Sequence, residues 1–419
     1  MGESTFVNQT RAQTRPAQAA RAVKNRRQGV DWILIAVTIA LTLFGLVMVY
    51  SAGPKVAQLG NNPDDYYLKR QLLWAVISFI AAGILSYIPY RLYIRLTVPM
   101  MFVTLLSLVA VVILADTTFN ANRSLLSGSI RPSELAKLVT IIYVSVWLYS
   151  KLDVLNDMSF GLVPLMLILG LTGGLILVQP DISAAITVIV LGGILFFLAD
   201  GEWRQIGLVL AFTVLIGWIV VNIYPTGMSR IMNYISGLRD PMQASYHVKR
   251  SLEAVINGGL FGVGIGHGST KFTGLPVAHT DSIFAVIAEE TGLIGSAIVI
   301  AAYLVILWRG LSIASNAPDK LGSLLASGIT VWITMEALLN IAVMVNLLPH
   351  AGNALPFISY GGSNLLITLS GIGILLNISR SSGEKDSYKG GGPFGAVVDL
   401  RWRDRRRRVS RFGRTPGAR

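Results

Sequence analysis

The sequence contains no cysteine and few charged residues. Without cysteine, a disulfide framework and thiol catalysis are both excluded. Charged residues make up 14% of the 419 residues and hydrophobic residues 53%, whereas a soluble protein carries roughly 25% charged residues. The composition therefore excludes an ordinary soluble domain and is typical of a membrane protein.

The sequence also lacks the patterns of a metal site and of a dinucleotide-binding site. The four histidines (His247, His267, His279 and His350) do not have the spacing of metal ligands, and a catalytic zinc needs three convergent ligands. The glycine-rich run at 258–268 follows no strand and has no βαβ context, so it does not indicate a dinucleotide site. We expect close-packed or re-entrant backbone there instead.

Ten apolar runs approach or exceed the ~18–20 residues that a helix needs to cross about 30 Å of hydrocarbon. They are residues 31–52, 70–89, 95–115, 134–150, 160–178, 182–199, 205–223, 283–308, 322–347 and 355–378. We therefore expect an all-α, polytopic membrane protein with about ten transmembrane helices, in a membrane domain at 31–379.

Basic residues collect in the two tails. Residues 1–30 carry a net charge of +5 and residues 380–419 one of +8, which together equal the +13 of the whole chain. The positive-inside rule places such segments in the cytoplasm, where they can also contact anionic lipid. We expect two flexible cytoplasmic tails and no nucleic-acid partner. The largest loop outside is then 224–282, between the seventh and eighth spans.

Several ionisable residues lie where they need an explanation. Arg123 is on the outer side, against the charge bias. Glu134 and Lys137 are three residues apart, on one face of a helix. They form either a local ion pair or part of a polar cavity open to the outside, because charge inside the membrane is costly.

Polar residues near other spans also allow two interpretations. Asp181 follows Gln179 and Pro180 and either caps the next helix or belongs to a site. Glu336 and Asn340 share one face of a span, where they either bond to neighbouring helices or line a cavity. Pro349, Gly352, Pro356, Gly361 and Gly362 break regular helix around residues 355–364, which at membrane depth requires surrounding protein or a water-filled cavity.

Asp281 stands where the largest outer loop re-enters the membrane. It or Thr280 could cap the helix that begins at Ile283, an ordinary role for these residue types. Alternatively, Asp281 is a carboxylate at the mouth of a cavity, with Glu289 about two turns deeper. The residues alone leave both interpretations open.

An ordered set of motifs resembles the SEDS family (shape, elongation, division and sporulation proteins), whose named types are FtsW, RodA and SpoVE. The motifs are RPSELAKL at 131–138, QPD at 179–181, RDP at 239–241, GGLFGVGIG at 258–266, LPVAHTD at 275–281, FAVIAEETG at 284–292 and LPFISYGGS at 355–363. They extend over the chain from about residue 30 to 380. The family usually has tryptophan at Ser124, glutamine at Arg131 and Glu336, phenylalanine at Ser282 and serine at Asn364, departures that bear on subfamily and substrate contacts.

The resemblance implies a peptidoglycan glycosyltransferase that polymerises lipid II, an undecaprenyl-diphosphate-linked disaccharide peptide, at the outer face of the bacterial cytoplasmic membrane during division or elongation. It also implies a class B penicillin-binding protein and other divisome or elongasome membrane proteins as partners. The motif aspartate falls on Asp281. Substrate-binding roles are expected for Arg123, Glu134, Lys137, Asp181, Lys249, Glu289, Glu336, Asn340 and Ser359.

This chemistry suits the residue types. A carboxylate such as Asp281 can take the proton of an acceptor hydroxyl as that hydroxyl attacks the donor sugar. The diphosphate leaving group needs positive charge from Arg123 and Lys137 or from a divalent cation such as Mg²⁺; no other cofactor is expected. A lipid-precursor flippase or transporter, and a non-catalytic scaffold that recruits a penicillin-binding protein, are the alternatives, although we find no repeated halves of the kind that transporters contain.

Overall fold

The computed structural model describes residues 29–114, 131–155, 157–223 and 225–382, and these residues form helices and loops without a strand. Each of the ten predicted spans overlaps one helix. These are α2 (Trp32–Ala52), α4 (Tyr66–Tyr87), α5 (Tyr93–Leu114), α6 (Pro132–Ser150), α7 (Val163–Val178), α8 (Ile182–Leu198), α9 (Trp203–Ile223), α13 (Ile283–Ser315), α14 (Lys320–Met344) and α15 (Gly362–Ser381). The fold class is confirmed: the chain is an all-helical, polytopic membrane protein.

Within the described ranges, six helical segments are long and apolar enough to cross a membrane. They are Trp32–Ala52, Tyr66–Tyr87, Tyr90–Ile113, Ile283–Ser315, Lys320–Met344 and Gly362–Ser381. The helices α7 and α8 and the first part of α9 are apolar but shorter. The last helix begins at Gly362 rather than at residue 355, because the predicted break in the backbone occupies the loop that precedes it.

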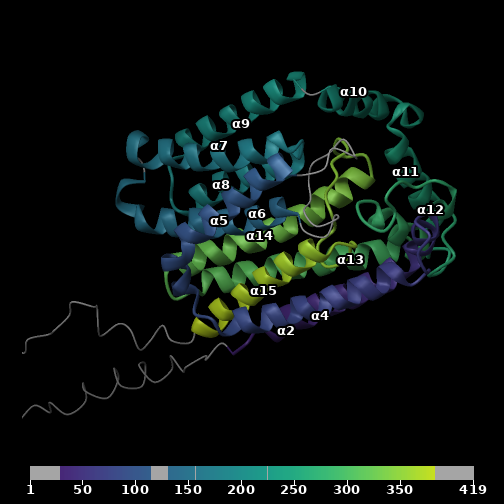
Figure 1. The fold of residues 1–419 in the computed structure, drawn as a ribbon, viewed down its shortest axis with the longest axis horizontal. Coiled ribbons are helices and arrows are strands. Elements are labelled where there is room, and N and C mark those ends of the chain that lie inside the picture. The colour runs from purple at the N-terminus through teal and green to yellow at the C-terminus, as the bar shows by residue number, and fades with distance from the viewer. Residues whose placement is uncertain (1–28, 115–130, 156, 224, 383–419) are drawn as a thin grey trace, which may run out of the picture. The chain divides into compact units, whose positions relative to one another are not determined.

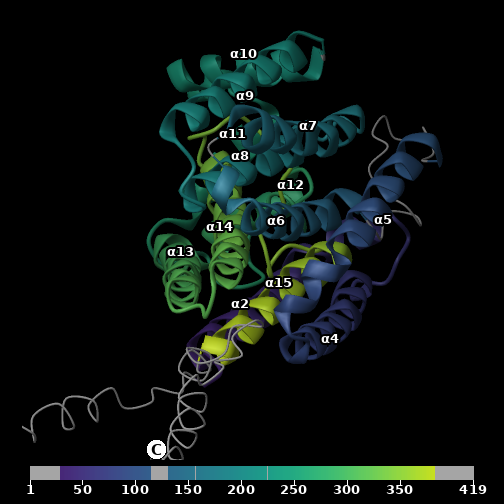
Figure 2. The ribbon, with the colours of Figure 1, turned by 90° about the vertical axis from the view of Figure 1, so that its left-hand side faces the viewer.

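The helices α14 and α15 form the centre of the bundle. In the apolar part of each of these two helices, 78% of the residues are buried inside the protein. The corresponding share in α2, α4, α5 and α13 is only 22–39%. Figure 2 shows α14 between α6 and α13, and α15 beside α4. Polar residues on the two central helices are thus kept away from lipid, where an unpaired polar group is expensive.

The loop between α9 and α13, predicted to lie outside, is largely helical. It contains α10 (Pro225–Arg239), a 3₁₀ turn at Pro241–Gln243, α11 (Tyr246–Gly258) and the single turn α12 (Thr270–Thr273). Figure 1 shows these elements gathered at one end of the bundle, beyond the ends of α2 and α4. The shorter helix α3 (Pro54–Leu59) joins α2 to α4.

Candidate active site

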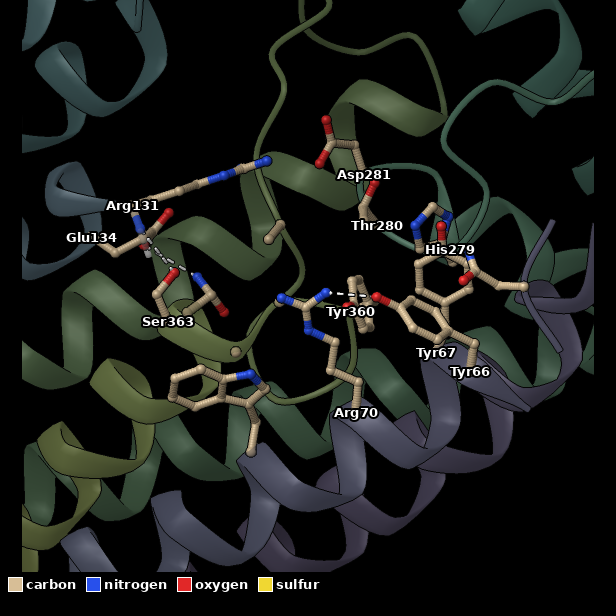
Figure 3. A pocket seen from close by; sticks show the side chains of 16 residues that line it. Tyr66, Tyr67, Arg70, Arg131, Glu134, His279, Thr280, Asp281, Tyr360 and Ser363 are labelled. Atoms are coloured by element: carbon tan, nitrogen blue, oxygen red, sulfur yellow. Dashed lines mark hydrogen bonds between the residues drawn. The ribbon is translucent and has the colours of Figure 1, made fainter. Parts of the chain in front are cut away.

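A cavity of about 340 Å³ lies between the first turns of α4 and α6, the turn before α13 and the loop before α15 (Figure 3). Its walls are polar and aromatic. The lining residues are Asn62, Tyr66, Tyr67, Arg70, Trp74, Arg131, Glu134, His279, Thr280, Asp281, Ala354, Tyr360, Gly361, Gly362, Ser363 and Asn364. The cavity therefore unites Glu134 and Asp281, which are 147 positions apart in the sequence.

Ser282, and not Asp281, stands at the N-cap position of the helix that follows. The N-cap residue of α13 is Ser282, and its side chain makes no capping hydrogen bond. The Ser282 hydroxyl instead donates to the carbonyl oxygen of Pro276 at 2.7 Å and lies 3.0 Å from Nε2 of His247. Thr280 also turns back, donating to the Val277 carbonyl. The prediction that Asp281 or Thr280 is a cap is wrong, and the Asp281 carboxylate belongs to the cavity.

Three successive backbone carbonyls hold the turn that carries Asp281. The His279 oxygen accepts from the Tyr360 amide at 2.9 Å, and the Thr280 oxygen accepts from the Ser359 hydroxyl at 2.7 Å. The Asp281 oxygen accepts from Nδ2 of Asn340 at 2.8 Å. Asn340 and Ser359, predicted to bind substrate, lie behind the cavity wall and fix the backbone of Asp281.

Asn340 and Ser359, which donate to the turn that carries Asp281, make further hydrogen bonds of their own. The Asn340 amide also donates to the Asn353 carbonyl at 2.6 Å, and the Ser359 hydroxyl accepts from the Leu355 amide. On α4, Gln71 donates to the Ser359 carbonyl and accepts from the amide of Gly361. The loop before α15 is thereby tied to α4, α14 and the turn before α13 at once.

Lys137 lies between two carboxylates beneath the cavity. Its ammonium group is 2.9 Å from Oε2 of Glu134 and also donates to Oε1 of Glu336. All three side chains are at least nine-tenths buried. Asn364 of α15 donates to Glu134 at 3.2 Å. The predicted ion pair is confirmed, and of the three charged groups only Glu134 lines the cavity.

Three further predicted residues, Asp181, Glu289 and Lys249, do not line the cavity. Asp181 caps α8 by accepting from the Ala184 amide, and it also accepts from the Ser133 hydroxyl of α6. Glu289 is buried and accepts from the backbone of Ser269 and Thr270. Lys249 is half-buried on α11, and Arg123 lies outside the described residues.

A match to a family model identifies the family of the chain that contains this cavity. Residues 31–384 match the model described as cell cycle protein, which groups FtsW, RodA and SpoVE. The chain belongs to this family.

Curated members of the FtsW/RodA/SpoVE family align over nearly their whole length. A probable peptidoglycan glycosyltransferase FtsW from Geobacter sp. (strain M18) is 38% identical, covering 84% of this chain and 98% of its own. Stage V sporulation protein E from Bacillus subtilis (strain 168) is 34% identical, covering 85% and 99%.

Solved structures share the fold. A chain from a peptidoglycan synthase complex that coordinates polymerization and crosslinking aligns with a TM-score of 0.68 at 25% identity, over 84% of this chain and 98% of that chain. The Thermus thermophilus Rod shape determining protein RodA aligns with a TM-score of 0.60 at 24% identity, over 84% and 97%, and supports the fold alone.

Sequence reasoning missed the α4 wall of the cavity in this family member. Arg70 is half-buried near the start of α4, where its guanidinium donates to the Tyr66 hydroxyl at 3.0 Å. Figure 3 shows Arg70 facing the cavity from the side opposite Asp281, with Arg131 extending from the start of α6. The signal was available, because Arg70 breaks the positive-inside pattern in the same way as Arg123.

Three histidines near the site, of which His279 is buried and His247 and His350 are half-buried, predict an acid-sensitive fold. Burial lowers the pKa of His247, His279 and His350 to about 4, and His350 is lowered further by His247 and Arg230. Unfolded histidines have a pKa of about 6.5, so between these values the unfolded chain binds more protons and stability rises with pH. We expect a lower Tm at pH 5 than at pH 7.

Thermal unfolding of the purified protein in lipid nanodiscs checks this expectation. Replacing His247 and His350, whose rings lie 4.1 Å apart, with glutamine should reduce the difference in Tm between the two pH values. An unchanged difference in that variant would assign the acid sensitivity to other groups.

Proposed function

We propose that this protein is a peptidoglycan glycosyltransferase that polymerises lipid II at the outer face of the bacterial cytoplasmic membrane, with both tails in the cytoplasm. The observation that carries the proposal is the placement of Asp281. Asp281 stands one residue before the N-cap position of α13, its backbone is fixed from behind, and it shares a cavity with two arginines.

These cavity groups suit glycosyl transfer to a sugar hydroxyl. Asp281 takes the proton of the acceptor hydroxyl while the hydroxyl oxygen bonds to the anomeric carbon of the donor. The bond from that carbon to the lipid diphosphate breaks, and the diphosphate leaves with the electron pair. Arg70 and Arg131, on other walls of the cavity, stabilise its developing negative charge.

Lys137 has a different role from the one that the sequence suggested. It is buried between Glu134 and Glu336, so its charge is already balanced by two carboxylates. We assign it to holding Glu134 at the cavity wall. Contact with the diphosphate then falls to Arg70 and Arg131.

A divalent cation such as Mg²⁺ fits the cavity only in part. Asp281 and Glu134 both line it, but the described residues contain no group of three ligands that could hold a metal ion. Mg²⁺ is commonly bound by one or two carboxylates together with substrate phosphates. We therefore expect these two carboxylates to hold such an ion when the diphosphate is bound, where it would neutralise phosphate charge.

A class B penicillin-binding protein is the expected partner, because a structurally similar chain comes from a synthase complex that joins polymerization to crosslinking. Such a partner would crosslink the strands that this chain produces. Division and elongation proteins of the membrane are further candidates.

A polymerisation assay tests the function directly. The purified full-length protein, in nanodiscs with fluorescent lipid II, should produce glycan strands that are resolved on a gel and digested by a muramidase. The assay is run with and without the penicillin-binding protein. A flippase would instead move lipid II across liposomes without forming polymer, and a scaffold would leave it unchanged even with an inactive partner present.

Ser359→Ala tests whether the backbone of the Asp281 turn must be fixed. The change removes the hydroxyl that donates to Thr280, so we expect kcat to fall about tenfold, the equivalent of one hydrogen bond of roughly 1.4 kcal/mol. KM for lipid II should change little, because Ser359 does not line the cavity.

Ser145→Ala is the matched control for this variant. Ser145 is also a fully buried serine, and its hydroxyl has no hydrogen-bond partner within the described part of the chain. Its kcat should equal that of the unaltered protein. A rise in KM at constant kcat in Ser359→Ala would instead assign Ser359 to substrate binding.

A further inference from the structure

The segment after α11 presents large apolar side chains on the outside of the protein. Ile256, Leu260, Phe261 and Ile265 are all more than half exposed, Phe261 at 79%. Residues 254–270 contain no aspartate, glutamate, lysine or arginine. An exposed apolar patch of this kind is unusual on a surface that faces water and marks contact with a partner or a membrane.

This segment is inserted into the hydrogen-bond ladder of α13. The helix is interrupted at Gly292, which has φ 68° and ψ −169°. The amides of Val263 and Gly264 donate to the carbonyls of Glu289 and Glu290 at 3.0 Å each. These are the carbonyls that the amides four residues later would use in an unbroken helix.

The helix amides freed by this insertion are bonded in turn to the segment. The Leu293 amide donates to the Gly259 carbonyl at 2.9 Å, and the Ile294 amide donates to the Leu260 carbonyl at 3.2 Å. The backbones approach so closely that a Cβ at Gly262 would lie 2.3 Å from the Glu290 oxygen. The segment Gly259–Ile265 is therefore fixed at the level of Gly292.

The exposure of α13 changes at the same level. Residues 283–290 are all buried in the protein, whereas Leu293, Ile294, Ile298, Leu304, Trp308 and Leu311 are exposed. From Leu293 to Leu311 the helix rises about 27 Å, close to the ~30 Å thickness of the hydrocarbon. Trp308 and Arg309 occupy the opposite end, where tryptophan and basic residues mark the cytoplasmic interface. Leu293 thus lies near the outer boundary of the hydrocarbon.

We propose that Gly259–Ile265 is a membrane-embedded segment whose partner is the acyl chains of the outer leaflet. Its apolar side chains continue the lipid-facing surface of α13, at the depth where that surface begins. The carbonyls of Gly259 and Leu260 and the amides of Val263 and Gly264 are bonded to α13, and such pairing with protein is what lets non-helical backbone lie at membrane depth. The lack of charge over residues 254–270 favours lipid over a water-exposed binding surface.

The absence of cysteine makes a direct test possible. Phe261→Cys in the full-length protein gives a single thiol for an environment-sensitive fluorophore, studied in nanodiscs of phosphatidylethanolamine and phosphatidylglycerol. The exposed outer-loop residue Gln243 and the exposed α13 residue Ile298 provide water-facing and lipid-facing references through Gln243→Cys and Ile298→Cys. Leu260→Cys replaces Phe261→Cys if the latter does not fold.

The label at residue 261 should resemble the label at 298. We expect blue-shifted emission, quenching by lipids spin-labelled near the headgroup and several-fold less quenching by iodide than at residue 243. Iodide quenching equal to that at residue 243 would overturn the proposal, because the segment would face water. Protection from both quenchers would also overturn it, since a protein surface, such as a second copy of this chain, would then cover the segment. The measurement does not depend on enzymatic activity.

Discussion

Asp281→Asn should lower the rate of lipid II polymerisation by roughly 10²–10⁴-fold, the contribution typical of a positioned general base. The amide has the size of the carboxylate but cannot take a proton from the acceptor hydroxyl. The substitution keeps the backbone carbonyl that accepts from Asn340, and it leaves Ser282, the N-cap residue of α13, unchanged. Folded yield and Tm should therefore stay close to those of the unaltered protein.

A matched control separates catalysis from a general effect of charge. Asp64 lies in the loop between α3 and α4, outside the cavity. Its carboxylate is exposed and accepts a hydrogen bond from the side chain of Gln58. Asp64→Asn should retain full activity. Near-normal polymerisation by Asp281→Asn at matched yield would remove Asp281 from the catalytic role, and co-purification with the penicillin-binding protein shows whether partner binding is intact.

Local patterns predicted the parts of the site that depend on neighbours in sequence. Glu134 and Lys137 are three residues apart, so helical geometry alone brings them together, and the structure places them 2.9 Å apart. Asp181 likewise caps α8 through an amide three residues later. The ten spans followed from length and apolarity, since a membrane leaves the backbone few alternatives to helix.

The position of Asp281 could not be decided locally. Either Thr280 or Asp281 is a suitable cap by residue type, but the chain uses Ser282 as the N-cap position without a side-chain bond. The Ser282 hydroxyl is occupied by Pro276 and by His247, which is 35 residues away. These bonds of Ser282 depend on the packing of α11 against the start of α13, which the local sequence does not show.

The cavity wall and the inserted segment also depend on distant contacts. Arg70 and Asp281 are 211 positions apart and share a cavity only because the loop before α15 joins α4 to the turn before α13. The glycine run was predicted to be close-packed or re-entrant backbone, and the close approach of Gly262 to α13 bears out the close packing. That it would pair with the backbone of α13 could not be predicted, because the helix from residue 283 to 308 was expected to be continuous through Gly292.

Lys137→Met should destabilise the protein by about 3–5 kcal/mol, the usual cost of breaking a buried ion pair from one side. The variant would leave Glu134 and Glu336 facing each other without the ammonium group between them. Polymerisation should fall as well, since Glu134 lines the cavity. Thermal unfolding in nanodiscs and the polymerisation assay measure the two effects separately.

Glu336→Gln should affect stability in the opposite direction from Lys137→Met, although it alters the same group of charges. One ammonium group lies between two carboxylates, those of Glu134 and Glu336. An amide can still accept from Lys137 through its oxygen, while the substitution removes the excess negative charge. We expect Glu336→Gln to keep or raise Tm and to retain activity.

The triple variant Lys137→Met, Glu134→Gln and Glu336→Gln completes the comparison. A buried pair replaced on both sides avoids the uncompensated charge that a single replacement creates, so the triple variant should recover most of the Tm lost in Lys137→Met. The non-additivity measures the coupling within the network. If the three single effects simply add, the ion pairs contribute little. If Tm recovers while polymerisation does not, the charge of Glu134 is needed at the cavity wall for the reaction itself.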